Sequence, residues 1–157
     1  MRIYGRDGKE LQARWNGDPR AYLGITSPGF PNLFCCYGPN TSIVANGSII
    51  FFSACEVRYI LGCIGLPPKG GHAALDCRRD VHDAYNRAID AENLEMAWGA
   101  ANVRTWYKNT KGRVTQNWPY PLVEFRHRNR TRTHPRRISL QSICETASRA
   151  AVLSVIT

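Results

Sequence analysis

Two apolar runs lie close together in the first half of the chain, separated by a short stretch rich in Gly, Pro and Asn. The first run, residues 33–37, is bounded by turn-forming residues on both sides, which predicts a strand buried on both faces, as in a parallel sheet. The second run, residues 48–64, follows Asn46-Gly47-Ser48 and ends at Gly65, which predicts a buried helix. The pattern therefore indicates a strand, a tight loop and a helix in succession.

A second helix is predicted further along the chain, where apolar and charged positions alternate at helical spacing. Val81, Tyr85 and Ile89 recur every four residues, so residues 78–98 are expected to form an amphipathic helix with one packed face. Its start carries several carboxylates, which we expect in the first turn because they complement the helix dipole. These carboxylates are Asp76, Asp80 and Asp83.

The remaining segments show weaker patterns. Residues 5–32 are rich in Gly and Pro and are expected to form ordered loop more than helix or strand. Residues 103–116 alternate on both sides of a Lys-Gly turn and predict a hairpin, and residues 122–125 predict a last strand. The whole pattern predicts an α/β fold over residues 1–125 and a divergent, disordered or weakly helical basic tail over residues 126–157.

Composition supports one domain with a real core, because 43% of the 157 residues are hydrophobic. The formal charge of +9 is unevenly placed, since residues 1–100 hold ten Lys/Arg against ten Asp/Glu and residues 101–157 hold eleven against two. A basic end is typical of proteins that bind nucleic acids or other polyanions. No helix-turn-helix, zinc or RNP pattern accompanies it, so nucleic acid is the less favoured partner.

The cysteines and the N-terminus indicate a cytoplasmic protein. The six cysteines show no paired spacing and mostly lie in apolar runs, so we expect reduced core thiols. Residues 1–6 carry no apolar block of the signal-peptide type. The apolar run at residues 48–64 contains Glu56 and Arg58, which favours a helix buried in protein over one that spans a membrane. The histidines lack metal-binding spacing, so no metal site is predicted.

The predicted strand, loop and helix have a shape that often binds ligands. In open α/β sheets a ligand lies beyond the carboxyl ends of the strands, where a tight loop leads into a helix. The N–H groups of residues 46–49 could stabilise a phosphate, or the carbonyl and negative charge of a reduced flavin ring. Plain packing is the favoured explanation on these residues alone, because the same pattern occurs in many folds without a ligand. The spacing is not GxGxxG, so the residues alone name no ligand.

The predicted hairpin carries a second candidate site. Trp106 stands beside Lys108, Lys111 and Arg113, so an aromatic ring could stack on a planar ligand while the cations bind a phosphate. The alternative is that Trp106 belongs to the core and the cations are solvated turn residues. The residues of the hairpin alone favour this second alternative.

A longer set of motifs resembles one enzyme family. In order along the chain these are AYLGI, PGFPNLF, YGPNT, GSIIF, EVRYI, TWYKN and WPYPL. Together they resemble the C-terminal part of FAD- and NADPH-dependent monooxygenases of the Baeyer–Villiger type, particularly those similar to 4-hydroxyacetophenone monooxygenase. The likeness runs over residues 3–125. It implies the C-terminal fragment of a Rossmann-type FAD/NAD(P)-binding flavoprotein fold.

The resemblance implies a function and a set of cofactor-binding residues. Members of the family use NADPH and O2 to insert oxygen into ketones or to oxidise heteroatoms, with FAD as the second cofactor. The segment from Tyr37 to Ser48 would approach the flavin ring, and the hairpin would close over the nicotinamide cofactor. The residues implied are Gly38, Pro39, Asn40, Thr41, Asn46, Gly47 and Ser48 in the first segment, and Trp106, Lys108, Asn109 and Arg113 in the hairpin.

Motifs that the family carries upstream do not occur in this sequence. These are the two GxGxxG motifs for FAD and NADPH, the family fingerprint between them, and the arginine that supports oxygen transfer. We identify no catalytic residue and expect the chain to be inactive alone, or to need a partner chain that carries the missing cofactor domains. The alternatives are a non-enzymatic basic module that binds nucleic acid or another polyanion, and an inactive gene fragment.

Overall fold

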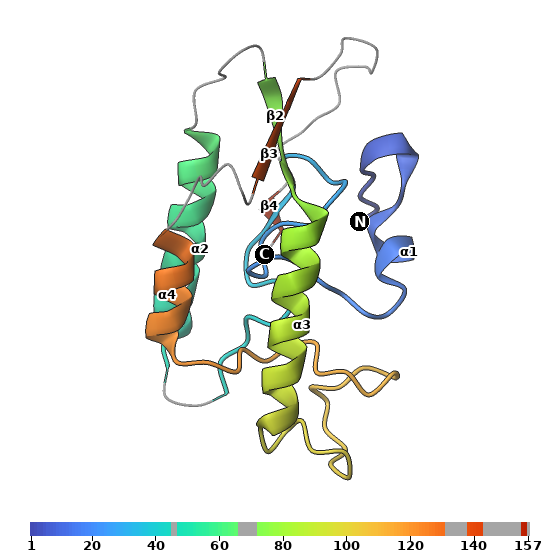
Figure 1. Ribbon diagram of the computed structural model, residues 1–157, viewed down its shortest axis with the longest axis vertical. Helices are drawn as coiled ribbons and strands as arrows, with labels where there is room; N and C mark the ends of the chain where they lie inside the picture. The colour runs from blue at the N-terminus through green and yellow to red at the C-terminus, as the bar shows by residue number, and fades with distance from the viewer. Residues whose placement is uncertain (45–46, 66–71, 131–137, 143–154, 157) are drawn as a thin grey trace.

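The computed structural model describes residues 1–44, 47–65, 72–130, 138–142 and 155–156. Within these residues, helices are combined with short strands (Figure 1). The helices are η1 (Arg6–Gly8), α1 (Leu11–Trp15), α2 (Ile49–Ile64), α3 (Arg79–Glu95) and α4 (Leu122–Arg130). The strands are β1 (Phe34–Cys35), β2 (His72–Cys77), β3 (Ile138–Ser142) and β4 (Val155–Ile156). Helices α2 and α4 lie side by side, and α3 continues directly from the end of β2.

The strands form two small pairs. Strand β1 pairs with β4 in parallel, with Phe34 opposite Val155. Strand β2 pairs with β3 in antiparallel fashion, with Leu75 opposite Leu140. The prediction of a buried strand at residues 33–37 is confirmed only over Phe34–Cys35, where the burial on both faces and the parallel pairing are as expected. Strand β2 was not predicted.

Helix α2 forms where its apolar run and its capping residues predict it. The Ser48 side chain accepts a hydrogen bond from the Phe51 N–H, and the Gly65 N–H donates to the Leu61 carbonyl at the other end (2.9 Å). The buried side chains recur at helical spacing: Phe52, Cys55, Glu56, Tyr59, Ile60 and Cys63. Within the described part of the chain, no helix has the length and apolar character needed to cross a membrane.

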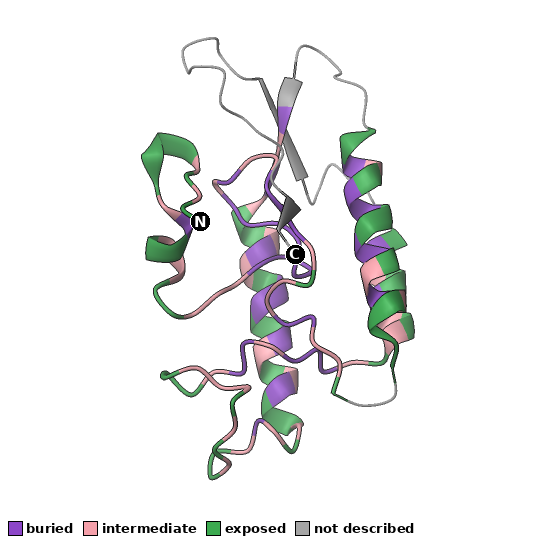
Figure 2. Ribbon diagram, turned by 180° about the vertical axis from the view of Figure 1, so that it is seen from behind, coloured by how far each residue is buried: buried purple, intermediate pink, exposed green. Residues whose placement is uncertain are grey.

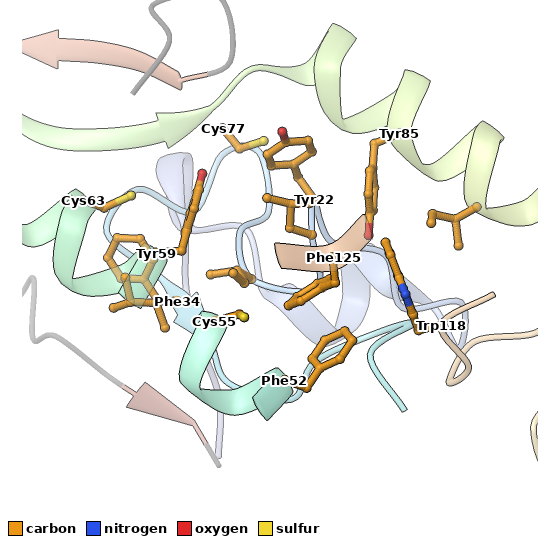
Figure 3. Close-up of a cluster of buried hydrophobic side chains, with 14 residues drawn as sticks. Tyr22, Phe34, Phe52, Cys55, Tyr59, Cys63, Cys77, Tyr85, Trp118 and Phe125 are labelled. Carbon is orange, nitrogen blue, oxygen red and sulfur yellow. The ribbon is translucent and has the colours of Figure 1, made fainter. Parts of the chain in front are cut away.

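Aromatic contacts join α2 to α4 (Figure 3). The rings of Phe52 and Phe125 are stacked, with centroids 3.5 Å apart. Trp118 contacts both edge-on, at 6.0 Å from Phe52 and 5.1 Å from Phe125. All three side chains are at most 4% exposed, and they belong to one core cluster with Tyr85 of α3. The core therefore brings together α2, α3, α4 and the segment before α4.

The prediction of a last strand at residues 122–125 is wrong, because these residues begin helix α4. Pro121 precedes the helix and its carbonyl accepts a hydrogen bond from the Glu124 N–H (3.1 Å). One turn later, Glu124 pairs with Arg128 at 2.7 Å, four residues along. Phe125 and Asn129, also four residues apart, are both buried. This helical spacing becomes visible only when the residues beyond 125 are included.

The helix predicted at residues 78–98 is confirmed as α3, which ends three residues earlier, at Glu95. Of the three carboxylates expected in its first turn, only Asp80 lies there, because Asp83 follows in the second turn and Asp76 precedes the helix. Asp76 is in β2, and its two carboxylate oxygens accept from the Gly29 N–H at 3.0 and 3.2 Å. Asp80 does lie in the first turn, where it pairs with Arg78. The Asp76 carboxylate therefore joins β2 to the N-terminal segment instead of capping the helix.

Both ends of the chain hold more regular structure than the sequence indicated. The five-residue helix α1 lies in the segment expected to be loop. At residues 138–142 a strand replaces the expected disordered or weakly helical tail. Helix α4 also crosses the boundary placed after residue 125, and the division into two domains there stays a prediction. The free cysteines in the described part of the chain are Cys35, Cys36, Cys55, Cys63 and Cys77.

The stacked pair Phe52–Phe125 gives a first prediction. Phe125→Ala removes a fully buried ring and leaves a cavity between α2 and α4, so the free energy of unfolding should fall by about 3–5 kcal/mol in urea or thermal unfolding. The control is Val123→Ala on the same helix, whose side chain is 71% exposed and which should change stability by less than about 0.5 kcal/mol. Equal effects of the two substitutions would contradict the packing of α4 on α2.

Candidate functional site

The chain makes a sharp turn directly after β1. Tyr37 and Asn40 both adopt left-handed backbone conformations, with φ of 56° and 57°. Gly38, between them, lies against the backbone of Gly24, and a Cβ atom there would overlap the Gly24 carbonyl oxygen. Only glycine fits this approach of two backbones. The turn places residues 35–39 along the edge of a cleft.

The cleft has a volume of about 640 Å³. This lies within the range of roughly 300–1,000 Å³ typical of small-molecule sites. One wall is the β1 end and the loop after it, and the other comes from the N-terminal segment and the approach to Asn117. The lining residues are Met1, Ile3, Leu11, Gln12, Trp15, Pro19, Cys35, Cys36, Tyr37, Gly38, Pro39, Ser42, Thr115 and Gln116. None of these side chains is charged, so the cleft suits an uncharged planar ring better than a phosphate.

The predicted loop residues divide into two groups. Gly38 and Pro39 line the cleft, while Asn40 and Thr41 are buried behind it. The Asn40 amide nitrogen donates to the carbonyls of Val114 and Asn117, at 2.9 and 3.2 Å. The Thr41 hydroxyl donates to the Gly38 carbonyl at 2.6 Å. These two side chains therefore fix the shape of the loop.

The residues predicted at the start of the second apolar run lie at the N-terminus of α2. Ser48 caps this helix, and Gly47 packs so closely on Ile43 and Leu122 that a Cβ atom would lie within 3 Å of both. Both residues are exposed and neither lines the cleft. Asn46 lies outside the described residues.

Arg113 lies at the centre of a ring of charged groups. Its guanidinium donates to Asp90 at 2.7 Å and to Asp18 at 3.1 Å. Arg20 completes the ring, at 3.1 Å from Asp18 and 2.6 Å from Asp90. Arg113 also donates to the Asn40 side-chain oxygen at 2.8 Å, and its own side chain is only 10% exposed. The ring therefore joins the loop after α1, helix α3, the hairpin and the turn behind the cleft.

The ring shifts the pKa values of Asp18 and Arg20 in the stabilising direction. Burial raises the pKa of Asp18, but the charges and hydrogen bonds of Arg113 and Arg20 outweigh it and hold that pKa below its ordinary value. Burial lowers the pKa of Arg20, and its contacts with Asp90 and Asp18 raise it above its ordinary value. All these contacts favour the ionised forms, so the ring is an electrostatic clamp at neutral pH.

The predicted hairpin is present as a tight reversal with one antiparallel bridge, between Lys108 and Val114. Asn109 shapes its turn, because its side-chain oxygen accepts from the Lys111 and Arg113 N–H groups, both at 3.0 Å. The Asn109 amide nitrogen also donates to Asp18 at 2.9 Å. The Lys108 ammonium donates to the carbonyls of Ala100 and Val103. The contacts of Lys108, Asn109 and Arg113 are thus structural, and none of the three lines the cleft.

Trp106 differs from its neighbours on the hairpin. Its side chain is 69% exposed, so the alternative that it belongs to the core is wrong. Its ring lies against the ring of Tyr107, with centroids 4.3 Å apart. The exposed Trp106 ring is available for contact with a ligand or another polypeptide, whereas Tyr107 is half-buried. The structure therefore separates Trp106 from the cleft while leaving it open to contact.

The comparisons with known proteins agree on one class. No family model matches the chain. It is 33% identical over 126 residues to an uncharacterized monooxygenase of Sinorhizobium fredii, covering 80% of this chain and 19% of that protein. It is 31% identical over 125 residues to a Baeyer–Villiger monooxygenase of Pseudomonas aeruginosa and 32% over 130 residues to one of Streptomyces coelicolor. These alignments cover 79% and 82% of this chain, and 24% and 25% of the two relatives.

Solved structures give the same answer. A steroid monooxygenase bound to NADP superposes with a TM-score of 0.70 and 25% identity, over 82% of this chain and 24% of that one. A cyclohexanone monooxygenase from Rhodococcus superposes with a TM-score of 0.72 and 20% identity, over 91% of this chain and 26% of that one. This second likeness shows the fold alone.

Sequence and fold together define a segment of a flavin-dependent monooxygenase. Within that class, the chain belongs to the Baeyer–Villiger family. It spans about a fifth to a quarter of the length of the curated relatives reported above. The narrower likeness to 4-hydroxyacetophenone monooxygenase stays a prediction.

The charged ring gives a second prediction. Arg113→Met should lower the free energy of unfolding by about 2 kcal/mol, between the values for exposed and buried ion pairs, because it leaves two half-buried carboxylates with one cation between them. The control is Arg104→Met, since Arg104 is exposed and makes no ion pair with a described residue. The measurement is urea unfolding at pH 7. A loss of unfolding free energy no larger than that of the control would contradict a stabilising role for the charged ring.

The lowered pKa of Asp18 gives a third prediction. Its ionised form contributes stability that is fully present above the ordinary pKa of 3.8 and is lost as the pH falls through the lower folded value. The stability difference between the wild type and Asp18→Asn should therefore be constant above about pH 5 and shrink below about pH 4. Thermal unfolding across this range measures it. A difference that persists unchanged at the lowest pH would speak against an ionic contribution.

Proposed function

We propose that this chain is the C-terminal segment of a FAD- and NADPH-dependent Baeyer–Villiger monooxygenase, and that its cleft receives the edge of the flavin ring. The observation that carries this proposal is the wall of the cleft, which the family motif YGPNT supplies through Tyr37, Gly38 and Pro39. The absence of charged side chains from the lining fits a planar ring. The complete enzyme would use O2 to insert oxygen into a ketone or to oxidise a heteroatom.

The residues of this chain would position the flavin ring and exclude water from it. The bound flavin supplies the redox chemistry, and the protein holds the ring and keeps water away from it. Gly38 lines the cleft, and its N–H donates to no acceptor among the described residues, so it is available to a polar atom on the ring edge. Asn40 and Thr41 hold this backbone in place from behind.

Trp106 is proposed to contact the nicotinamide cofactor. Its exposure supports this role, because the indole ring offers a flat apolar surface, and Tyr107 supports the ring from one side. The internal contacts of Lys108 and Arg113 do not support a role for them as phosphate ligands. The NADPH phosphates would then be bound by another part of the complete enzyme.

An exposed apolar surface on α2 supports the proposal that a partner polypeptide carries the FAD- and NADPH-binding domains. The outer apolar face of α2 comprises Ile50, Val57, Leu61 and Ile64, which are 79%, 45%, 62% and 47% exposed. Their spacing of seven, four and three residues places them on one side of the helix, opposite the buried face. Exposed positions alternate with buried ones along this helix (Figure 2). Contiguous exposed apolar surface marks contact with another polypeptide. The much greater length of the relatives fits this, because their additional residues would cover such a face.

The basic-module alternative has less support. Arg128 is part of the fold, where it pairs with Glu124 and lies over the Tyr120 ring at 4.6 Å. Residues 131–137, which carry much of the basic run, lie outside the described residues. Both comparisons favour the flavoenzyme. A cytoplasmic location stays part of the proposal.

A chimera tests the proposal. The aligned segment of the Streptomyces coelicolor relative is replaced by residues of this chain, and the purified protein is loaded with FAD and desalted. We expect a retained 450 nm flavin band near one per chain and ketone-dependent oxidation of NADPH. Gly38→Val should abolish flavin retention because its side chain would overlap Gly24, whereas Val123→Ala should not.

The outcomes separate the two parts of the proposal. A folded chimera that retains no flavin would overturn the assignment of the cleft. This chain alone is expected to retain no flavin after desalting. Retention near one per chain by this chain alone would overturn the need for a partner polypeptide.

A further inference from the structure

A fully buried carboxyl group lies behind the wall of the cleft. Glu56 is on the inner face of α2 and is 0% exposed. One of its oxygens, Oε2, accepts a hydrogen bond from the Tyr37 N–H at 2.9 Å. The other, Oε1, has no hydrogen-bond partner in the described part of the chain. Burying an ionised carboxylate with only one hydrogen bond is energetically costly. The protonation state of Glu56 should therefore affect the structure around it.

The group that Glu56 holds is the turn of the cleft wall. Tyr37 has a left-handed backbone with φ of 56°, a conformation unfavourable for a bulky residue. Its hydroxyl lies 3.2 Å from the Ser42 hydroxyl, and both residues line the cleft. The Glu56–Tyr37 hydrogen bond therefore links a buried helix position to the exposed wall.

No described cation compensates a negative charge on Glu56. The titratable groups that face it are Cys35 and Cys36 from the wall, Cys55 from its own helix, and Tyr85 from α3. Burial raises the pKa of Glu56 to about 7, against the opposing effect of the Tyr37 N–H. Burial also raises the pKa of Cys35, to about 11, and that of Cys36. Of these groups, Glu56 is thus the one expected to change charge near neutral pH.

We propose that Glu56 is a pH-sensitive positioning residue that holds the Tyr37 turn closed when its carboxyl is neutral and loosens the cleft wall when it is ionised. A neutral acid can stay buried and still accept the Tyr37 N–H through its carbonyl oxygen. The ionised group has a second oxygen without a partner, so it gains by admitting water, and water can enter only if the wall moves. This inference does not depend on the proposed function, because the chain without cofactor shows it.

The effect on stability has a definite direction. Because the folded protein binds the Glu56 proton more tightly than the unfolded chain, the group contributes stability below its ordinary pKa of 4.5. That contribution is lost as the pH rises to about 7. Glu56→Gln keeps an acceptor for the Tyr37 N–H and cannot ionise. It should therefore lack this decline.

The test follows the Tyr37 amide by NMR in the full-length chain between pH 5 and 8.5. We expect its ¹⁵N shift to titrate with a midpoint near 7 in the wild type and to stay flat in Glu56→Gln. The melting temperature of the wild type should fall relative to Glu56→Gln as the pH rises through this range. The control is Glu95→Gln, since Glu95 is exposed on α3 and its loss should leave the wild-type titration unchanged.

The results decide between a pH-sensitive and a merely structural role. A Tyr37 amide that does not titrate between pH 6 and 8 would overturn the proposal, as would a titration that persists in Glu56→Gln. A shift in stability that is equal at all pH values would indicate packing alone. If Glu56→Gln does not fold, the ¹³C shift of the Glu56 carboxyl in the wild type gives the answer, and a midpoint near its ordinary pKa of 4.5 would overturn the proposal.

Discussion

The contact of Arg113 with two carboxylates is the constraint on which the cleft depends. A single guanidinium joins Asp18 from the loop after α1, Asp90 from α3, and Asn40 from the turn behind the cleft. Its planar fork can satisfy these partners at once, which a lysine could not do. Segments distant in sequence are thereby fixed relative to one another at the place where the wall of the cleft begins.

Apolar and polar contacts stabilise different parts of this fold. The stacked rings of Phe52 and Phe125 hold α4 on α2, and this contact is independent of the charged ring. The loop after β1, which lines the cleft, is instead shaped by the side-chain hydrogen bonds of Asn40 and Thr41. Apolar packing therefore determines where the helices lie, and buried polar side chains determine the shape of the loop.

The long helices could be predicted from the sequence, because their apolar positions recur within one window. The runs that became α2 and α3 carried enough spacing and capping information to place them within a few residues. Helix α4 could not be read correctly from four residues, since its period appears only with Asn129 included. Strand β2 was missed because the strand that pairs with it comes from more than sixty positions later in the chain.

Most of the side-chain contacts at the site could not be predicted from the sequence. The motif YGPNT contains three residues that line the cleft, Tyr37, Gly38 and Pro39, and their role stays a prediction. Nothing in the sequence shows that Arg113 reaches Asp90 rather than solvent. Glu56 appeared only as a charge that disfavoured a membrane helix, although it supports Tyr37 from inside. Side-chain partners brought together by folding leave no local pattern, which is why positioning residues are harder to predict than the elements that carry them.

The contact of Gly38 with Gly24 determines how the cleft can move. Because no side chain separates these two backbones, the wall is in direct contact with the turn at residues 22–26. A local displacement of the wall toward this turn is therefore blocked at once. The wall can therefore move only away from this turn, and the contact of the two glycines sets the limit of its movement on that side.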